Sequence, residues 1–546
     1  MRSDWFILLL VLFFFISCDH DATHDSRKAF RYNESQGIST LDPAYTKSLG
    51  LLRATAQLYN GLLQLNDSLR VIPCIAKRWR ISDNGKRYTF ILRQDVFFHD
   101  HPFFPNGKGR RVVASDFSYS FNRIIDPRVA SPGSWIFNSL NKSAEGFQNG
   151  FRAVNDTVFE IALKNSFPPF QGILTMPYCY VVPHEIVERY GNDFGHHPVG
   201  TGPFRCKLWI DGEKLIFVRN EKYFEKDTNG LSIPYLDAVA ITFINDLQSE
   251  FLQFLKGNLD FLSGVSSTSK DELITRMGEL NPKYESSIKM YTRPYLNTVY
   301  LGFFAEPAIA ITGNSPVYNE RVRKAINYGM DRKKIIKFLR NNIGMPANSG
   351  FVPKGLPSYS EMKVKGYDYD PDKARQLLAE AGYPMGKGLQ PISLVTTVLG
   401  VEICEYIQQE LSQIGIKINI EVNTGASFFD LISNSKAAFF YNGWIADYAD
   451  AENYLSLFYS KNFSPGGPND FHFKDTTFDR LYIKAMNTEI DSVRYKYYQL
   501  MDHIIIDKAA VVPLFYDEVV CFTHRNIENF QVNSQNQFNL KYVIKH

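Results

Sequence analysis

The order of apolar residues in the second half of the chain constrains the fold more than any other feature. Asp370-Pro371 combines a helix cap with a first-turn proline, and apolar residues follow it at helical spacing. A strand over 392–396, a helix over about 402–414 and an alternating strand over 416–422 come next. Because parallel neighbouring strands need a crossover connection, this succession predicts a parallel βαβ unit.

Elements of both kinds are also expected nearer the N-terminus. The spacing of apolar residues predicts helices over 51–63 and 319–328, and Ser115 is expected to cap a further helix that Asp126-Pro127 ends. The Asn84-Gly85 pair between alternating residues predicts a hairpin. A chain of 546 residues is long enough for two or three domains, so we expect a large α/β protein with at least two lobes.

The composition argues against nucleic acid as a partner and is compatible with a ligand-binding pocket. The formal net charge is only +3, which argues against a nucleic-acid binder whose affinity rests on neutralising phosphates. The chain holds 43 Phe and 31 Tyr. Many of these rings are expected in the core, but tyrosine also lines hydrated pockets, because its ring is apolar and its tip is polar.

An apolar run near the N-terminus predicts export. Residues 6–16 are all apolar, and a helix of this length spans only about 16 Å, too short for a bilayer core of about 30 Å. The run ends just before Cys18 and resembles a bacterial lipobox, which implies a lipoprotein signal peptide over 1–17 and lipidation of Cys18. An ordinary signal peptide with an incidental cysteine is the alternative. Asp19 favours retention at the inner membrane, and residues 18–28 are predicted to form a flexible tether.

No motif for catalysis or metal binding stands out. The chain has no G-x-S-x-G, Walker A, H-E-x-x-H or helix-opening G-x-G-x-x-G sequence. Neither of the close histidine pairs, His99/His101 and His196-His197, has partners at zinc spacing. We therefore predict no catalytic residue, no metal and no cofactor. The cysteines after Cys18 are expected to be single buried thiols: Cys74, Cys179, Cys206, Cys404 and Cys521.

Six short blocks occur in a characteristic order over about residues 30–546. They include Leu41-Asp42-Pro43, Ala76-Lys77-Arg78-Trp79, Ala114-Ser115-Asp116-Phe117, Thr201-Gly202-Pro203-Phe204, Asn319-Glu320-Arg321-Val322-Arg323 and Gly443-Trp444-Ile445-Ala446-Asp447-Tyr448. No single block is decisive, but six of them in order are specific. In these blocks the chain resembles the bacterial extracellular solute-binding proteins of family 5, the substrate-binding proteins of oligopeptide and dipeptide ABC transporters.

The resemblance implies an α/β fold of the two-lobed periplasmic binding protein type (class II, cluster C), with three domains and a hinge. Domain I would be discontinuous and would comprise residues 29–65, 191–280 and 506–546. Domain II would comprise residues 66–190, and domain III residues 281–505. Ligand would be enclosed between the lobes as they close about the hinge.

The resemblance also implies a set of ligand-binding residues. Asp447 would pair with the N-terminal ammonium of a peptide, because a buried ammonium needs an opposite charge. Trp444 and Tyr119 would line the cleft, and Leu49 would contribute main-chain contacts. From the residues alone, an aspartate in a surface loop and aromatic rings in the core are the competing interpretations. The peptide backbone is expected to bind as an added strand, which gives affinity regardless of side-chain identity.

The chain departs from the family pattern at two positions. Oligopeptide binders carry an arginine two residues before the Gly-Trp pair and a histidine in the preceding βαβ unit, both for the ligand carboxylate. Here Tyr441 stands at the first position and Leu399 near the second. Since an arginine fork binds a carboxylate strongly, its absence puts recognition of the peptide C-terminus in doubt.

These observations predict a monomeric periplasmic lipoprotein that captures short peptides and delivers them to the permease of an ABC importer. The alternatives within the fold are a nickel chelate, a sugar or a cell-wall peptide as the solute. A lipid-anchored hydrolase and a lipoprotein that binds no small ligand are alternatives from other classes.

Overall fold

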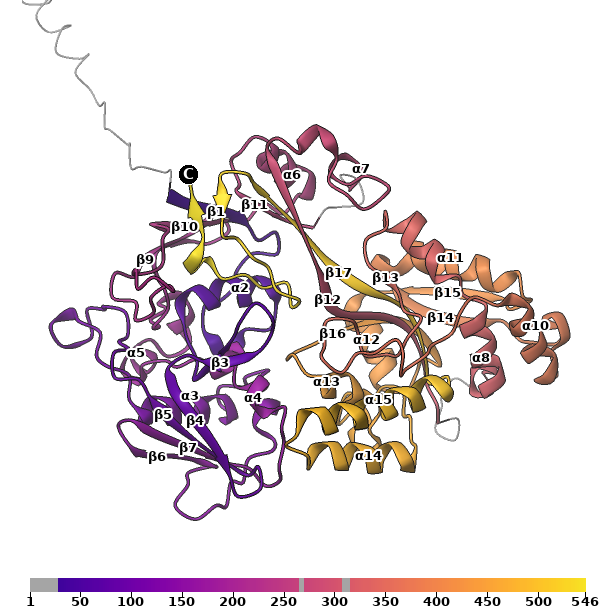
Figure 1. The fold of residues 1–546 in the computed structure, drawn as a ribbon, viewed down its shortest axis with the longest axis horizontal. Helices are drawn as coiled ribbons and strands as arrows, with labels where there is room; N and C mark the ends of the chain where they lie inside the picture. The colour runs from indigo at the N-terminus through magenta and orange to yellow at the C-terminus, as the bar shows by residue number, and fades with distance from the viewer. Residues whose placement is uncertain (1–27, 265–269, 307–314) are drawn as a thin grey trace, which may run out of the picture.

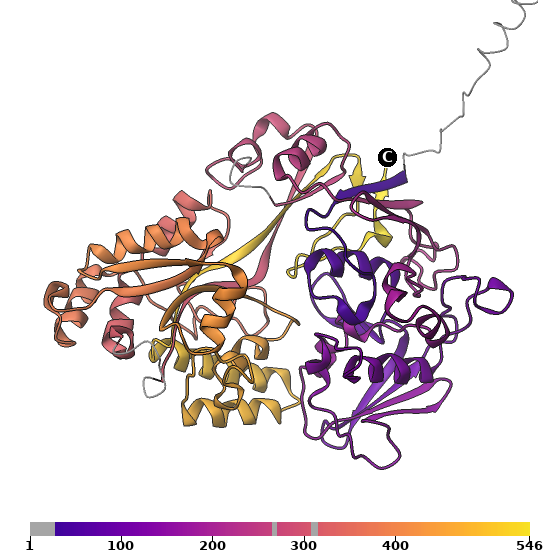
Figure 2. The same ribbon diagram turned by 180° about the vertical axis from the view of Figure 1, so that it is seen from behind.

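A computed structural model of the chain describes residues 28–264, 270–306 and 315–546. The predicted signal peptide, Cys18, Asp19 and all of the tether except Lys28 lie outside the described residues. The described chain forms two lobes, with the N-terminal and C-terminal segments together in the first lobe (Figures 1 and 2). Two long strands run from one lobe to the other.

The first lobe contains two four-stranded sheets. In one, strand order is β1-β10-β9-β8, with β1 parallel to β10 and the other pairs antiparallel. In the other, the order is β4-β5-β7-β6 and every pair is antiparallel. The strands are β1 (Ala29–Asn33), β4 (Ala76–Ser82), β5 (Arg87–Leu92), β6 (Phe151–Asn155), β7 (Val158–Ala162), β8 (Phe204–Ile210), β9 (Lys214–Arg219) and β10 (Ala238–Thr242).

The local predictions for the first lobe are confirmed in type and corrected at their ends. The Asn84-Gly85 hairpin joins β4 to β5, and both residues have positive φ, 52° and 81°. Helix α3 (Ala114–Ile125) ends at Asp126 as predicted, but it begins one residue before Ser115, and the Asp116 carboxylate caps its start. The helix expected over 51–63 is α2 (Leu49–Leu58), because the chain turns into strand β2 afterwards.

Strands β12 (Ile288–Phe303) and β17 (Val511–His524) connect the lobes. They pair antiparallel along most of their length, with register shifts in the middle. Both belong to a seven-stranded sheet in the order β11-β17-β12-β16-β14-β15, with β13 beside β17. The remaining strands of this sheet are β11 (Phe261–Ser263), β13 (Met345–Pro346), β14 (Ile392–Thr397), β15 (Ile418–Asn423) and β16 (Phe439–Ile445).

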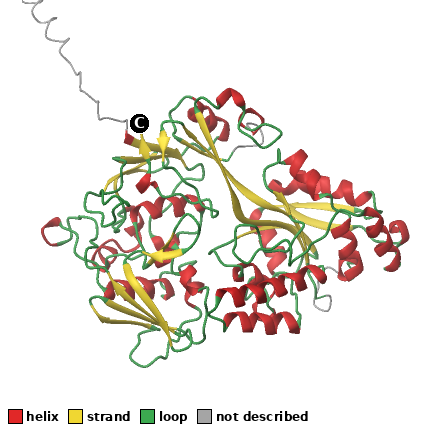
Figure 3. Cartoon of the chain, viewed as in Figure 1, coloured by secondary structure: helices red, strands yellow, loops and turns green. Residues whose placement is uncertain are grey.

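The βαβ unit predicted in the second lobe is confirmed. Strands β14 and β15 are parallel, and α11 (Val401–Ser412) connects them. Helices α8 (Glu320–Tyr328) and α10 (Pro371–Glu380) begin after the capping side chains of Asn319 and Asp370. Helices lie around this sheet and line the lower edge of the lobe (Figure 3).

The other helices and strands are short or peripheral. They are β2 (Leu63–Leu65), β3 (Val71–Pro73), α4 (Phe170–Ile173), α5 (His184–Tyr190), α6 (Leu247–Leu255), α7 (Lys270–Leu273), α9 (Arg332–Lys334), α12 (Gly425–Ser433), α13 (Glu452–Leu455), α14 (Thr476–Met486), α15 (Asp491–Asp507), β18 (Ile527–Glu528) and β19 (Ile544–Lys545). Within the ranges described, no helix is both long and apolar enough to cross a membrane.

The core is divided between the lobes, and aromatic rings fill much of it. One cluster of buried side chains occupies the first lobe, and two further large clusters occupy the second. The five cysteines after Cys18 are free thiols, of which Cys206 alone is only partly buried. Phe167 packs against clusters of both lobes, so the lobes are in contact as well as joined.

Candidate functional site

Asp447 lies just beyond β16, where the chain leaves the seven-stranded sheet. Asn453 of α13 holds this loop. Its Oδ1 accepts hydrogen bonds from Asp447 N at 3.1 Å and from Trp444 Nε1 at 2.9 Å. Its Nδ2 donates to Asp447 Oδ2 at 3.3 Å. One amide therefore brings Trp444 and Asp447 together and fixes the orientation of both.

Asp447 is an exposed residue, and its carboxylate has no cationic partner among the described residues. The surrounding protein nevertheless desolvates the carboxylate, which raises the pKa of Asp447 above its usual value, and the hydrogen bond from Asn453 lowers that pKa. A partly desolvated carboxylate without a counter-ion costs free energy in the empty protein. A ligand cation placed here would relieve that cost.

The loop that carries Asp447 touches the first lobe. The centroid of the Tyr448 ring lies 6.4 Å from that of Trp135, and Tyr448 belongs to the buried cluster of the first lobe. Burial, followed by the negative charge of Asp447, raises the pKa of the first-lobe residue Tyr178 to about 12. Gln535 of the C-terminal segment donates to Asp447 O at 3.5 Å. Asp447 therefore lies where the lobes meet.

The buried side chain of Glu452 holds the loop that carries Asp447 through hydrogen bonds. Glu452 is 3% exposed and accepts hydrogen bonds from the hydroxyls of Tyr448 and Tyr482. Burial raises the pKa of Glu452 to about 7, although the two hydroxyl bonds lower it, and the charges of Asp450 and Asp447 raise it further. Because Glu452 holds the ring that contacts the first lobe, we assign it a positioning role.

The other two predicted binding residues lie on helices of the first lobe. Tyr119 is half-buried on α3, and its ring centroid lies 5.8 Å from that of His184. Leu49 is the first residue of α2. No hydrogen bond, ion pair or ring contact in the described part of the chain joins either residue to Asp447 or Trp444. The structure thus brings two of the four predicted residues together.

A cation that no sequence pattern predicts lies near Tyr441. The guanidinium of Arg340 pairs with Asp517, and its Cζ lies 4.4 Å from the centroid of the Phe515 ring. Asn297 Nδ2 donates to the same Asp517 carboxylate at 3.2 Å. Burial raises the pKa of Tyr441, and the Arg340 charge lowers it, so the two side chains interact electrostatically. Arg340 follows a π-helical turn, and no local signal in the sequence marks it.

The second unusual position, Leu399, is 95% exposed in the turn between β14 and α11. Its neighbour Gly400 makes room for the Tyr441 ring, since a Cβ on Gly400 would lie 2.6 Å from that ring. At the two positions where the resemblance implies basic side chains, the structure has the Tyr441 ring packed against Gly400 and the exposed Leu399. The nearby cation, Arg340, comes from another part of the chain.

The histidines of the two close pairs contact other groups of the protein. His99 is buried and its Nε2 lies 3.0 Å from Gly202 O, whereas His196 and His197 both contact Asp193. Among the residues with a described position, no group of three or more His, Cys, Asp or Glu side chains could hold a metal ion.

Curated proteins of similar length match nearly the whole chain. It is 26% identical over 511 residues to the glutathione-binding protein GsiB of Shigella flexneri, covering 92% of each chain. It is 27% identical over 512 residues to the heme-binding protein A of Haemophilus influenzae, covering 90% of this chain and 88% of that one.

Solved structures show the same fold. The periplasmic binding protein DppA of Helicobacter pylori, in complex with the peptide STSA, matches with a TM-score of 0.74 and 25% identity, covering 95% of this chain and 98% of that one. HbpA2 of Haemophilus parasuis matches with a TM-score of 0.79 and 22% identity, covering 95% and 100%. The fold is therefore that of the two-lobed periplasmic binding proteins of cluster C, as the sequence predicts. The model of the bacterial extracellular solute-binding proteins, family 5, matches residues 70–466, and the chain belongs to that family.

Proposed function

We propose that this protein captures short peptides between its lobes and delivers them to an ABC importer. The observation that carries the proposal is the Asp447 carboxylate, which has no counter-ion in the described chain and lies where the lobes meet. A free peptide supplies the missing charge in its N-terminal ammonium. The peptide-bound DppA and the glutathione-binding relatives support a peptide-like ligand for this chain.

The edge of β16 supports binding of an extended backbone. Strand β14 pairs with β16 at Phe440 alone, whereas β12 pairs with β16 from Phe439 to Ile445. The edge of β16 that leads to Asp447 is therefore not covered by a strand, and a peptide could add to it. Within this proposal, Trp444, Tyr119 and Leu49 contact the peptide as the family resemblance implies.

For the other end of the ligand we propose Arg340. Its guanidinium interacts with Tyr441, at the position where the family resemblance implies an arginine, and Asp517 holds it in place. A guanidinium can pair with two carboxylates at once, because it has five N–H donors in a planar fork. Arg340 would thus bind the peptide C-terminus without leaving Asp517.

We further propose that the protein is exported and anchored through Cys18 on the periplasmic side of the inner membrane, and that it acts as a monomer without enzymatic activity. The apolar run over residues 6–16 and the lipobox-like end of that run support the anchor. The domains would follow the boundaries predicted from the sequence, with domain I built from three segments.

Native mass spectrometry of the protein purified without residues 1–18, followed by sequencing of whatever is released on denaturation, tests the ligand class. Heterogeneous short peptides with free N-termini are the expected result. A single non-peptide mass would keep the family and overturn the ligand. Thermal stabilisation by a nickel chelate, or by a sugar whose effect Asp447→Asn abolishes, but by no peptide, would favour another solute in the same cleft.

A further inference from the structure

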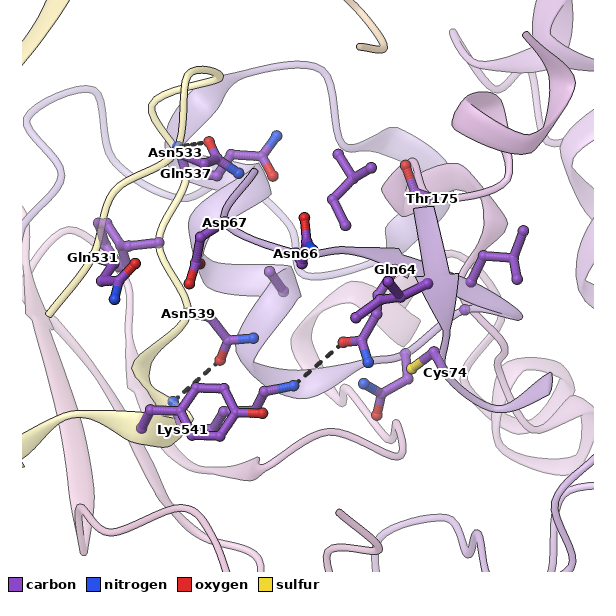
Figure 4. Close-up of a pocket in the computed structure, with 18 of the residues that line it drawn as sticks. Gln64, Asn66, Asp67, Cys74, Thr175, Gln531, Asn533, Gln537, Asn539 and Lys541 are labelled. Carbon is purple, nitrogen blue, oxygen red and sulfur yellow. Dashed lines mark hydrogen bonds between the residues drawn. The ribbon is translucent and has the colours of Figure 1, made fainter. Parts of the chain in front are cut away.

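The first lobe contains a cavity of about 700 Å³ that none of the proposed peptide-binding residues lines. Its walls are the β2–β3 hairpin, the loop over residues 226–235 and the C-terminal segment over 529–542 (Figure 4). The volume lies within the range of roughly 300–1,000 Å³ that is usual for small-molecule sites. No residue of the second lobe's β14–β16 region contributes, so the cavity is separate from the site at Asp447.

Carboxamide side chains dominate the wall, and three of them are held in fixed orientations. Asn66 Oδ1 accepts from Ser68 N at 3.0 Å and from Arg70 N at 2.9 Å. Asn533 Oδ1 accepts from the backbone N–H groups of residues 535 and 537, and Asn539 Oδ1 accepts from that of residue 541. The NH₂ groups of these three side chains donate to no other described residue, so each remains available as a donor.

Two further carboxamides are free to adapt. The side chains of Gln531 and Gln537 make no hydrogen bond to other described residues, and each offers both donors and an acceptor. Figure 4 shows them with Asn533 and Asn539 on the C-terminal segment along one side of the cavity. A wall that combines fixed donors with adaptable amides suits a ligand with many hydroxyl groups, since a hydroxyl is both donor and acceptor.

Few charged side chains line the wall, and two of them already have partners. Lys541 is 3% exposed and pairs with Glu225, and its Nζ also donates to Gln64 Oε1 at 3.3 Å. Asp227 accepts from the Tyr235 hydroxyl and from two backbone N–H groups. The remaining charged side chains of the wall, Lys226 and Asp67, have opposite signs. Apart from the Lys541–Glu225 pair, the wall therefore carries one cation and two carboxylates, and it offers an ionic ligand no cluster of charges of one sign.

We propose that this cavity binds an uncharged, polyhydroxylated ligand, namely a saccharide of one or two rings. The carboxamides would bind its hydroxyls, and the rings of Tyr235 and Tyr542, which also line the cavity, would pack against its C–H faces. The site is independent of the proposed peptide site. The loop between Asn533 and Gln537 separates the two, because Gln535 points the other way and donates to Asp447 O.

Isothermal titration of residues 19–546, which contain every described element, with maltose, cellobiose and N,N′-diacetylchitobiose tests the proposal. We expect at least one of these probes to bind at a one-to-one ratio with a Kd below about 1 mM. The double variant Gln531→Ala/Gln537→Ala should weaken that binding by at least about tenfold, because the adaptable partners are lost. Gln248→Ala on the exposed face of α6 is the matched control and should leave it unchanged.

Two comparisons keep this test separate from that of the peptide site. Asp447→Asn should leave saccharide affinity unchanged, and the double glutamine variant should leave peptide affinity unchanged. If the double variant does not fold, the single change at the exposed Gln531 replaces it. The proposal is overturned if none of the three probes binds, if binding survives the loss of both glutamines, or if Asp447→Asn abolishes it.

Discussion

The substitution Asp447→Asn tests the central element of the proposed function. Asparagine has the shape of aspartate and can still hydrogen-bond to Asn453, so the change removes the charge and little else. At about 4 Å and an effective dielectric constant near 20, a carboxylate and an ammonium attract each other by about 4 kcal/mol. Loss of one partner of a desolvated pair costs about 2–5 kcal/mol, so Kd for peptides should rise by roughly 30-fold or more.

The assay is calorimetric titration with trialanine and with N-acetylated trialanine. The wild type should prefer the free amine strongly, whereas Asp447→Asn should bind both peptides with similar, weak affinity. Asp211→Asn, an exposed aspartate of the first lobe, is the matched control. Equal affinity of the wild type for both peptides, or an unchanged Kd in the variant, would refute the pairing of Asp447 with the ammonium.

Although Asp447→Asn should weaken peptide binding, it should not reduce the thermal stability of the protein without ligand. The pKa of Asp447 is raised in the folded state, so the folded protein holds its proton to higher pH than the unfolded chain does. Above that raised pKa the charged carboxylate destabilises the fold. Asp447→Asn should therefore leave the unliganded protein at neutral pH equally stable or more stable in thermal unfolding. A loss of stability would show that the carboxylate has a structural partner.

Three further substitutions test the neighbouring parts. Arg340→Gln should weaken peptides with a free C-terminal carboxylate by about tenfold or more and leave C-terminally amidated peptides unaffected, as measured by titration of both forms. Glu452→Gln should raise the free energy of unfolding above pH 7 by up to about 3 kcal/mol, because the pKa of Glu452 is raised to about 7 and its charge destabilises the fold above that pH. Below about pH 4.5 the two proteins should have the same free energy of unfolding in denaturant titrations. Cys18→Ala should move the protein from the membrane fraction to the soluble fraction; persistence in membranes would refute the anchor.

Much of the fold could be predicted because its signals are local. The Asp370-Pro371 cap, the hairpin at Asn84-Gly85 and the βαβ unit each depend on residues within a few turns of one another, and all three are present. The errors are local too. The sequence predicts Ser115 as a cap, but the carboxylate one residue further along accepts from the backbone instead. As the third residue of the helix, Asp116 can reach back to the backbone N–H of Val113, as the acid of a capping box does.

The site could be predicted only where one segment carries it. Trp444 and Asp447 lie three residues apart, and Asn453 in the same segment joins them. Arg340 could not be inferred, because its approach to Tyr441 depends on a turn that is distant in the sequence and on Asp517 of β17. Spacing along the chain carries no information about such a pair.

Strands β12 and β17, which run from one lobe to the other, explain why Arg340, Tyr441 and Asp447 belong to one region of the molecule. Asn297 of β12 donates to Asp517 of β17. The next strand of the sheet, β16, carries Tyr441 in its first half and leads to Asp447 just beyond its end. Groups proposed for the two ends of a peptide thus stand along one strand of the sheet that joins the lobes. Any rotation of the lobes about β12 and β17 would move the first-lobe contacts of Asp447 while leaving its distance to Arg340 nearly fixed. If a peptide binds as proposed, its length would be set within the second lobe, and closure would change the surroundings of Tyr178 and Trp135 in the first.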